Sequence, residues 1–332
     1  MAPSQQKALF LDSRFGKFVL DTTDVPKPGP DDILVKIKAV ALNHVDWKIQ
    51  KYGIFVKSFP AILGSDMAGE VEQLGEGVIG FAVGDRVLSQ GAFASNRTMF
   101  FQQYAIVKPE TLGKLPSNVA FGEMLLLFLW DSPLHTSGCT TVLRPTLRGE
   151  PSHPRRLQLC GSIRHPTRQT VWVLINYRNP FPETFVLPPI LGATHVLDRN
   201  SPPERLTVEI SKIAGSVRYV FDAISLPGTQ KFGYSLLASG GRLGLVGLDA
   251  VENKVAGKSV IMVFGTVDNP ENRDMLLILY KNITSLLEER ANKPNRVEVL
   301  KNGLGGILGG LQQMEKDLMS GVKLVVKPDE TL

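Results

Sequence analysis

The first third of the chain consists of short stretches in which apolar and polar residues partly alternate, the pattern of half-buried β-strands. Glycine and proline residues separate these stretches. We expect strands over residues 32–42, 67–74 and 85–88 and a helix over 47–52. Many short strands joined by glycine turns are typical of a compact, barrel-like β domain. The sequence therefore predicts a β-rich domain over residues 1–123.

After residue 190 the pattern changes to short apolar runs that alternate with segments of helical periodicity. The expected strands are 193–197, 217–222 and 242–246, and the expected helices are 203–214 and 228–238. Such alternation indicates βαβ units and a parallel sheet, and places the chain in the α/β class. Residues 271–289 carry apolar residues at the period of an amphipathic helix. A helix over 310–319 and a strand over 322–326 complete the predicted elements.

Residues 124–190 differ from the rest of the chain in composition. They contain seven arginines and nine prolines, whereas all twenty lysines lie elsewhere. Proline lacks the backbone N–H donor, so this density disfavours a buried parallel strand and the helix after it. A dinucleotide-binding fold requires a strand, a glycine-rich turn and a helix that begins at the pyrophosphate. Residues 150–168 contain three prolines and a single glycine, Gly161, so we expect no such turn there.

The arginine-rich, lysine-free composition of this segment indicates a reading-frame error. When codons compatible with residues 155–173 are read one base later, they can encode GGSSSVGQYAIQLAKLSGF, a glycine-rich turn followed by a helix. One hypothesis is therefore that the chain is mis-spliced or mis-predicted, has lost cofactor binding and is catalytically inactive; it is the alternative to an active enzyme. In such a chain the dinucleotide-binding sheet would lack its first strand and the helix after it, and this loss would leave a sheet edge and apolar surface uncovered.

Charge and composition exclude several classes of function. The net charge is +5, but residues 124–190 account for +4 of it, and the remaining residues hold 30 bases against 29 acids. A charge concentrated in one anomalous segment is not a nucleic-acid-binding face. The longest apolar run, 124–130, is too short to cross a bilayer. Cys139 and Cys160 are too few for a disulfide framework or a four-cysteine zinc site. We expect a cytoplasmic protein with neither nucleic-acid nor membrane partners.

An ordered series of short motifs points to a known family. Residues 43–48, 64–71 and 83–87 read NHVDWK, GSDMAGEV and VGDRV. Together they resemble the medium-chain dehydrogenase/reductase superfamily in order and spacing. The later segments that fit its cofactor domain or its fungal zinc-independent branch are 191–198, 220–222, 240–243, 293–297 and 321–326. That branch includes the trans-acting enoyl reductases of polyketide pathways and relatives of quinone oxidoreductases.

The resemblance implies a domain organisation and an activity. It implies a GroES-like catalytic domain over 1–123, a Rossmann-type doubly wound parallel sheet over 124–268, and a segment over 269–332 that returns to the catalytic domain. We expect the first βα unit of the Rossmann sheet to be damaged. The implied activity is NADPH-dependent, zinc-independent reduction of an activated C=C bond by hydride transfer. The substrate would be an enoyl thioester, free or carrier-bound, or a quinone or enone, and the protein would be a monomer or homodimer.

The resemblance also implies site residues, although each has a structural alternative. Asn43, Asp46 and Lys48 would lie near the nicotinamide or support that loop, or Asp46 would merely cap a helix. His44 is expected to be a loop residue rather than a general acid. The implied cofactor-binding residues are Asp222, Ser225, Val246, Gly247, Phe264, Gly265 and Thr266, but Asp222 and the glycines would also suit plain turns.

The same resemblance bears on metal binding. Zinc-dependent members of the superfamily carry a cysteine near the segment of Asn43 and a His-Glu pair where this chain has Ser65 and Asp66. Residues 1–123 contain no cysteine. Catalytic zinc needs about three converging nitrogen, sulfur or oxygen ligands with one open position. We therefore expect no metal site.

Overall fold

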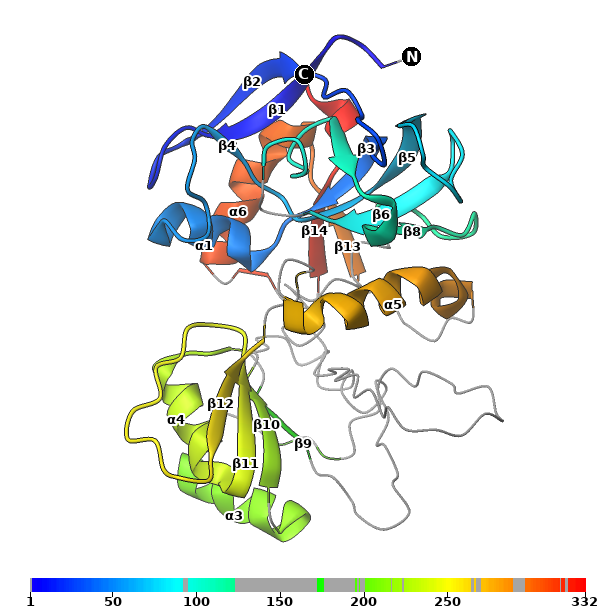
Figure 1. Ribbon diagram of the computed structural model, residues 1–332. Helices are drawn as coiled ribbons and strands as arrows, with labels where there is room; N and C mark the ends of the chain where they lie inside the picture. The colour runs from blue at the N-terminus through cyan, green and yellow to red at the C-terminus, as the bar shows by residue number, and fades with distance from the viewer. Residues whose placement is uncertain are drawn as a thin grey trace, which may run out of the picture. The chain divides into compact units, whose positions relative to one another are not determined.

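The structure is a computed structural model that describes residues 2–91, 95–122, 172–175, 195, 197, 201–215, 217–222, 224–263, 266, 270–288, 296–316, 318–319 and 322–332. The chain divides into two compact units, which Figure 1 shows. Unit 1 comprises Met1–Asp131 and Gly265–Leu332, and unit 2 comprises Ser132–Phe264. Unit 1 is therefore built from both ends of the chain.

Two sheets form unit 1. Their strands are β1 (Gln5–Leu11), β2 (Phe18–Asp24), β3 (Ile33–Ala41), β4 (Ala61–Ile62), β5 (Asp66–Leu74), β6 (Arg86–Gln90), β7 (Tyr104–Val107), β8 (Leu112–Lys114), β13 (Arg296–Val299) and β14 (Val322–Val326). The smaller sheet has the order β2-β1-β4, and the larger has β13-β14-β3-β5-β6-β8 with β7 also paired to β3. β3 is central and almost entirely buried, because it pairs with β5, β7 and β14.

The helices of unit 1 pack against these sheets. They are α1 (His44–Tyr52), α5 (Pro270–Glu288) and α6 (Ile307–Glu315), with 3-10 turns η1 (Pro109–Thr111), η4 (Gly303–Gly306) and η5 (Pro328–Glu330). α1 contacts α6, and α5 contacts β8. Leu276, Tyr280 and Ile283 form the buried face of α5. A Cβ at Gly113 would lie 2.4 Å from Ile283, so this glycine permits the close approach of helix to strand.

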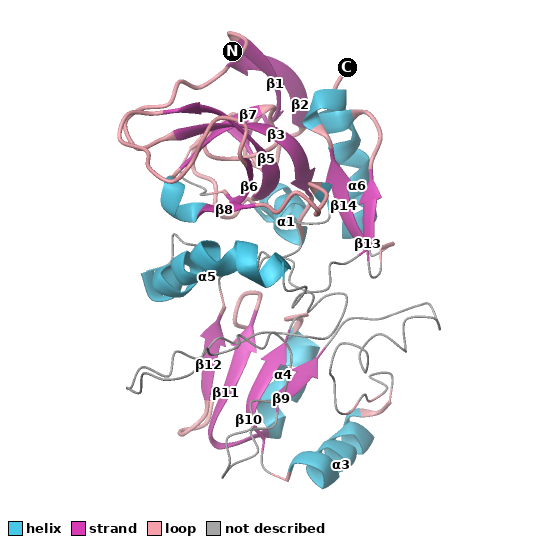
Figure 2. Ribbon diagram, turned by 90° about the vertical axis from the view of Figure 1, so that its right-hand side faces the viewer, coloured by secondary structure: helices cyan, strands magenta, loops and turns pink. Residues whose placement is uncertain are grey.

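Unit 2 contains a parallel sheet of four strands in the order β12-β11-β10-β9 (Figure 2). Its elements are β9 (Trp172–Ile175), α3 (Pro203–Ala214), β10 (Val217–Asp222), α4 (Pro227–Leu236), β11 (Leu237–Leu245) and β12 (Ser259–Met262). α4 packs against β10 and β11. Val220, Leu243 and Leu245 supply the buried apolar contacts of the sheet. The predicted α/β class and parallel sheet are confirmed.

One expectation about residues 124–190 was wrong. Their proline content argued against a parallel strand, yet Trp172–Ile175 forms β9 and pairs with β10 in parallel register. This run is apolar and free of proline, so it can supply the ladder donors that a proline lacks. The remainder of the segment, and with it the question of a phosphate-binding turn, lies outside the described residues.

The boundaries of three predicted helices also differ from expectation. α1 begins at His44 rather than residue 47, because its N-terminal turn is capped from Asn43. α4 ends at Leu236, since Leu237 adopts extended backbone and begins β11. α6 begins at Ile307, which is fully buried, and ends at Glu315 rather than residue 319. The strand expected over 193–197 lies outside the described residues apart from His195 and Leu197.

Candidate functional site

The first turn of α1 is held by a reciprocal cap. Asn43 precedes the helix in an extended conformation, with φ −123° and ψ 151°. Asp46 is fully buried, and its carboxylate accepts a hydrogen bond from the Asn43 backbone N–H at 2.8 Å. This bond satisfies a donor that the helix itself leaves unpaired. Asp46 therefore contributes to the cap from the third position of the helix, whereas the alternative to a catalytic role made Asp46 itself the cap residue of a helix over 47–52.

The side chain of Asn43 sits in a buried polar cluster, which we call the Asn43 cluster and define as Asn43, Ser65, Asp66 and Lys323. The Asn43 amide Nδ2 donates to Ser65 Oγ at 3.0 Å and to Asp66 Oδ2 at 2.9 Å. Its Oδ1 accepts a hydrogen bond from Lys323 Nζ. Lys323 is 5% exposed and the other three side chains are fully buried. Both the nitrogen and the oxygen of the Asn43 amide thus have hydrogen-bond partners inside the protein.

α5 brings a tyrosine to the same region. The Tyr280 hydroxyl accepts a hydrogen bond from the Gln90 backbone N–H at 3.2 Å. Burial raises the pKa of Tyr280 well above its ordinary value, and the negative charge of Asp66 adds to this effect. Tyr280 is therefore a neutral phenol at physiological pH. Asp66 is thus close enough to Tyr280 of α5 to influence its pKa.

His44 and Lys48 are half-buried polar residues in the first two turns of α1. The Trp47 indole Nε1–H donates to His44 Nδ1 at 3.0 Å, so the neutral imidazole carries its proton on Nε2. The Lys48 ammonium lies 5.7 Å from the Trp47 ring centroid, within cation–π range. His44 therefore has an orienting partner three residues along the helix. The i,i+3 spacing of His44 and Trp47 was visible in the sequence, but its significance was missed.

In unit 2, Asp222 closes the end of β10. One carboxylate oxygen accepts the backbone N–H groups of Ile224 and Ser225, both at 2.9 Å. The other oxygen accepts the Thr229 hydroxyl at 2.7 Å. Burial raises the pKa of the Asp222 carboxyl, and the three hydrogen bonds oppose that rise. The side chain is fully buried, so its contacts organise the turn into α4.

Ser225 joins the loop after β10 to the end of β11. Its hydroxyl accepts the Val246 N–H and donates to the Asp222 carbonyl, both at 2.9 Å. Ser225 has φ +55°, and a Cβ at Gly247 would lie 2.8 Å from the Ser225 Cβ. Gly247 is thus needed for the close approach of the two loops. The structure brings Asp222, Ser225, Val246 and Gly247 together at the carboxyl ends of parallel strands, where doubly wound sheets bind ligands.

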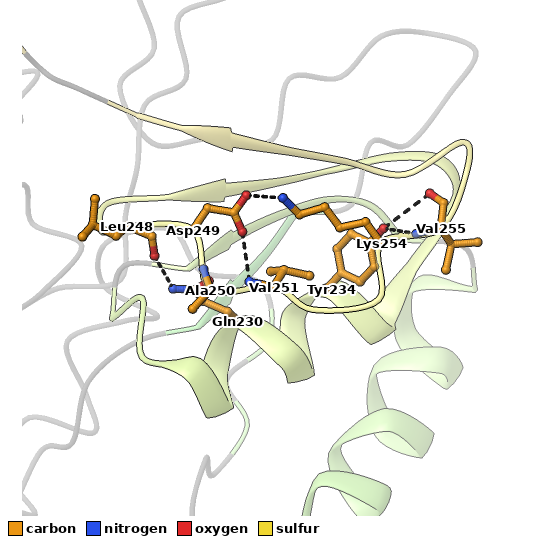
Figure 3. A network of polar contacts seen from close by, with 8 residues as sticks. All are labelled: Gln230, Tyr234, Leu248, Asp249, Ala250, Val251, Lys254 and Val255. Atoms are coloured by element: carbon orange, nitrogen blue, oxygen red, sulfur yellow. Dashed lines mark hydrogen bonds and ion pairs between the residues drawn. The ribbon is translucent and has the colours of Figure 1, made fainter.

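The loop that follows β11 is fixed to α4 by residues that the sequence did not reveal (Figure 3). The Gln230 side-chain amide donates to the Leu248 carbonyl at 2.9 Å and accepts the Ala250 N–H at 2.8 Å. Further along, the Tyr234 hydroxyl accepts the Val255 N–H at 2.8 Å. Gln230 also donates to the Ser225 carbonyl at 2.9 Å. The rim of this strand-end site is therefore held in place from α4.

The other predicted cofactor-binding residues are Phe264, Gly265 and Thr266. Phe264 and Gly265 lie outside the described residues. Thr266 is half-buried and belongs to the final segment of unit 1 rather than to unit 2. Among the described residues of the predicted set, Asp222, Ser225, Val246 and Gly247 lie together in the loops after β10 and β11.

The residues present fit a nicotinamide dinucleotide only in part. The strand-end loops of unit 2 offer a rigid rim, but Asn176–Pro180, which follow β9, read NYRNP and contain no glycine. Close approach of backbone to a pyrophosphate normally requires glycine at that turn. Zinc is a poorer fit, because the Asn43 cluster offers an amide, a hydroxyl and a carboxylate together with an ammonium. Within the described ranges, no three His, Cys, Asp or Glu side chains gather to hold a metal.

Comparisons with known proteins agree with this architecture. Residues 29–117 match the alcohol dehydrogenase GroES-like domain. The trans-enoyl reductase RAP2 of Pyricularia oryzae is 28% identical and is aligned over 98% of each chain. A solved putative zinc-dependent alcohol dehydrogenase from Rhizobium etli CFN 42 superposes with TM-score 0.73 and 20% identity, over 98% of this chain and 99% of that one. A quinone oxidoreductase of Pseudomonas syringae superposes with TM-score 0.69 and 18% identity, over 96% and 99%.

The family model covers the GroES-like domain, whereas the trans-enoyl reductase and the two solved structures cover nearly the whole chain. The solved structures are similar to this chain in fold, and the trans-enoyl reductase is similar to it in sequence over nearly its full length. Among the residues that the structure describes, no helix has the length and apolar composition to cross a membrane. By these similarities the chain resembles the enoyl reductase-like members of the medium-chain dehydrogenase/reductase superfamily, whose members are oxidoreductases that use a nicotinamide cofactor.

Proposed function

We propose that the protein reduces an activated C=C bond, with NADPH as hydride donor and without zinc. The observation that carries the proposal is the full-length similarity to a trans-enoyl reductase. The quinone oxidoreductase fold supports the same class of reaction. An enoyl thioester or a quinone or enone has the electron-poor double bond that accepts hydride. NADPH, when bound, would supply this hydride, and the protein would supply orientation and polar contacts.

Within this proposal the residues of the first turn of α1 have different roles. Asn43 and Asp46 are positioning residues, because both are fully buried and their hydrogen bonds hold the start of the helix. Lys48 is the contact residue, since its half-exposed ammonium can stabilise the negative charge that hydride addition places on the carbonyl oxygen. Trp47 restricts Lys48 by the cation–π contact. In unit 2, Val246 and Gly247 would line the nicotinamide.

The test uses Lys48→Met, with Lys57→Met as the matched control at an exposed position. NADPH oxidation is followed by absorbance with crotonyl-pantetheine and with a benzoquinone as substrates. We expect kcat to fall by about 100-fold in Lys48→Met, because loss of one charge-stabilising group costs about 3 kcal/mol. NADPH affinity should be unchanged, and Lys57→Met should behave as wild type. Equal activity of Lys48→Met and wild type would show that Lys48 does not touch the reacting atoms.

A second candidate is a chain without cofactor binding, as expected for a mis-spliced or mis-predicted product. The observation in its favour is that residues 176–191, which follow β9 in the sequence, contain no glycine. Titration of NADPH, followed by nicotinamide fluorescence, separates the two candidates, because only the first predicts saturation. Sequencing the transcript across codons 120–195 tests the cause. A verified open frame as printed would remove the frame error, whereas a shifted frame would assign the activity to the corrected chain.

A further inference from the structure

Lys323 lies in β14 between residues of the unit 1 core. Its neighbours Leu324 and Val325 are 2% and 1% exposed, and Lys323 itself is 5% exposed. A lysine is rarely buried to this degree without compensating partners, because removal of an ammonium from water is costly. Its ammonium donates to Asn43 Oδ1, across 280 positions of sequence. The burial of this lysine is therefore tied to the Asn43 cluster.

The cluster forms a continuous chain of hydrogen bonds between two groups of opposite charge. Lys323 donates to one end of the Asn43 amide, and the other end donates to the carboxylate of Asp66 at 2.9 Å. The amide has a definite orientation, because only its oxygen can accept from an ammonium and only its nitrogen can donate to a carboxylate. The Asn43 backbone is at the same time the cap of α1. The orientation of the amide thus connects β14 and β5 to the start of α1.

We infer that Lys323 is a positioning residue, the internal cation that orients the Asn43 amide and thereby fixes the first turn of α1. The ammonium draws the amide oxygen toward β14 and leaves both amide hydrogens for Ser65 and Asp66. A fixed cation is needed here because Asp66 is a fully buried carboxylate. The network uses the ammonium to organise its polar groups, a role that a bound metal ion fills in other buried polar clusters. This inference does not depend on the proposed reaction.

The experiment compares Lys323→Met with Lys327→Met in the full-length chain. Methionine keeps the length of the lysine side chain and removes its charge and its donors, and Lys327 is an exposed lysine just beyond the same strand. Hydrogen exchange of the Asn43 side-chain amide, measured by NMR with asparagine-selective nitrogen labelling, reports the orientation directly. We expect exchange to be about 10- to 100-fold faster in Lys323→Met and unchanged in Lys327→Met, as befits loss of one charged hydrogen bond. Unchanged exchange in Lys323→Met would overturn the inference.

Two further measurements keep the inference testable if Lys323→Met does not fold. In the wild-type protein, NMR of lysine side-chain nitrogens should show one ammonium whose protons exchange slowly. That signal should be retained in Lys327→Met, and its absence from the wild type would overturn the inference.

In the double variant Asp66→Asn with Lys323→Met, both charges are removed, so folding should be recovered relative to Lys323→Met. A zinc content of one per chain after dialysis, lost in Asp66→Asn, would instead show that the cluster binds a metal and that Lys323 is not its cation.

Discussion

Replacement of Asn43 by leucine is the strongest single perturbation that the structure offers in unit 1. Leucine has a similar size but removes the hydrogen bonds to Ser65, Asp66 and Lys323. Two of these bonds involve buried charged groups, and each such bond contributes about 1.5–3 kcal/mol. We therefore expect Asn43→Leu to lower the free energy of unfolding by about 3–6 kcal/mol. That is a large part of the about 5–15 kcal/mol by which proteins are usually stable.

Urea unfolding followed by far-ultraviolet circular dichroism measures this loss. With a denaturant slope of about 1–3 kcal/mol per molar urea, the midpoint should fall by at least about 1 M. The matched control is Asn282→Leu, because Asn282 is an exposed residue of α5 whose side chain donates to the Ile278 carbonyl at 2.7 Å. The control should change stability by no more than about 0.5 kcal/mol. A loss below about 1 kcal/mol in Asn43→Leu would refute the reasoning that the cluster holds the start of α1.

Three further predictions concern unit 2 and α5. Burial raises the pKa of Asp222, so the native state retains this proton at pH values where the unfolded chain has already lost it. The contribution of Asp222 to the free energy of unfolding therefore falls as the pH rises above 3.8. Urea unfolding at pH values from 3.8 upward should show a weaker fall in Asp222→Asn than in the wild type. Gly247→Ala places a Cβ 2.8 Å from Ser225 and should cost about 1–3 kcal/mol by the same assay, whereas Gly228→Ala, with nothing within 4 Å, should cost far less. Tyr280→Phe leaves the Gln90 backbone N–H without its acceptor and should lower the free energy of unfolding by about 1–3 kcal/mol. An unchanged melting temperature would show that this hydrogen bond does not stabilise the protein.

Local patterns in the sequence predicted the bounds of several elements. Residues 203–214, 217–222 and 322–326 form a helix and two strands with the expected bounds. The strand Trp172–Ile175 was missed because the proline content was averaged over a long segment, which hid a short apolar run. Whether a strand forms depends on that run and on its pairing with β10. Composition over a longer window does not decide it.

The polar contacts of the site were predicted less well than the fold. A capping role of Asp46 was one of two alternatives, but its partner was not predicted, because the helix was expected to begin at residue 47 rather than at His44. The role of Lys323 could not be found, since its partner Asn43 is 280 positions away in the sequence. Gln230 belongs to no recognised motif, and its role depends on a loop about 20 residues later, as the 2.8 Å contact with Ala250 shows. Contacts between distant segments become visible only once the fold is known.

Titration of the full-length protein with NADPH tests the proposed function most directly. The residues that would bind the nicotinamide at the ends of β10 and β11 are held by hydrogen bonds, whereas residues 176–191, which follow β9 in the sequence, contain no glycine. We predict a saturable change in nicotinamide fluorescence with NADPH and a weaker change with NADH. An unsaturable signal with both nucleotides, from protein that remains folded, would contradict the proposal and favour a chain that has lost its cofactor.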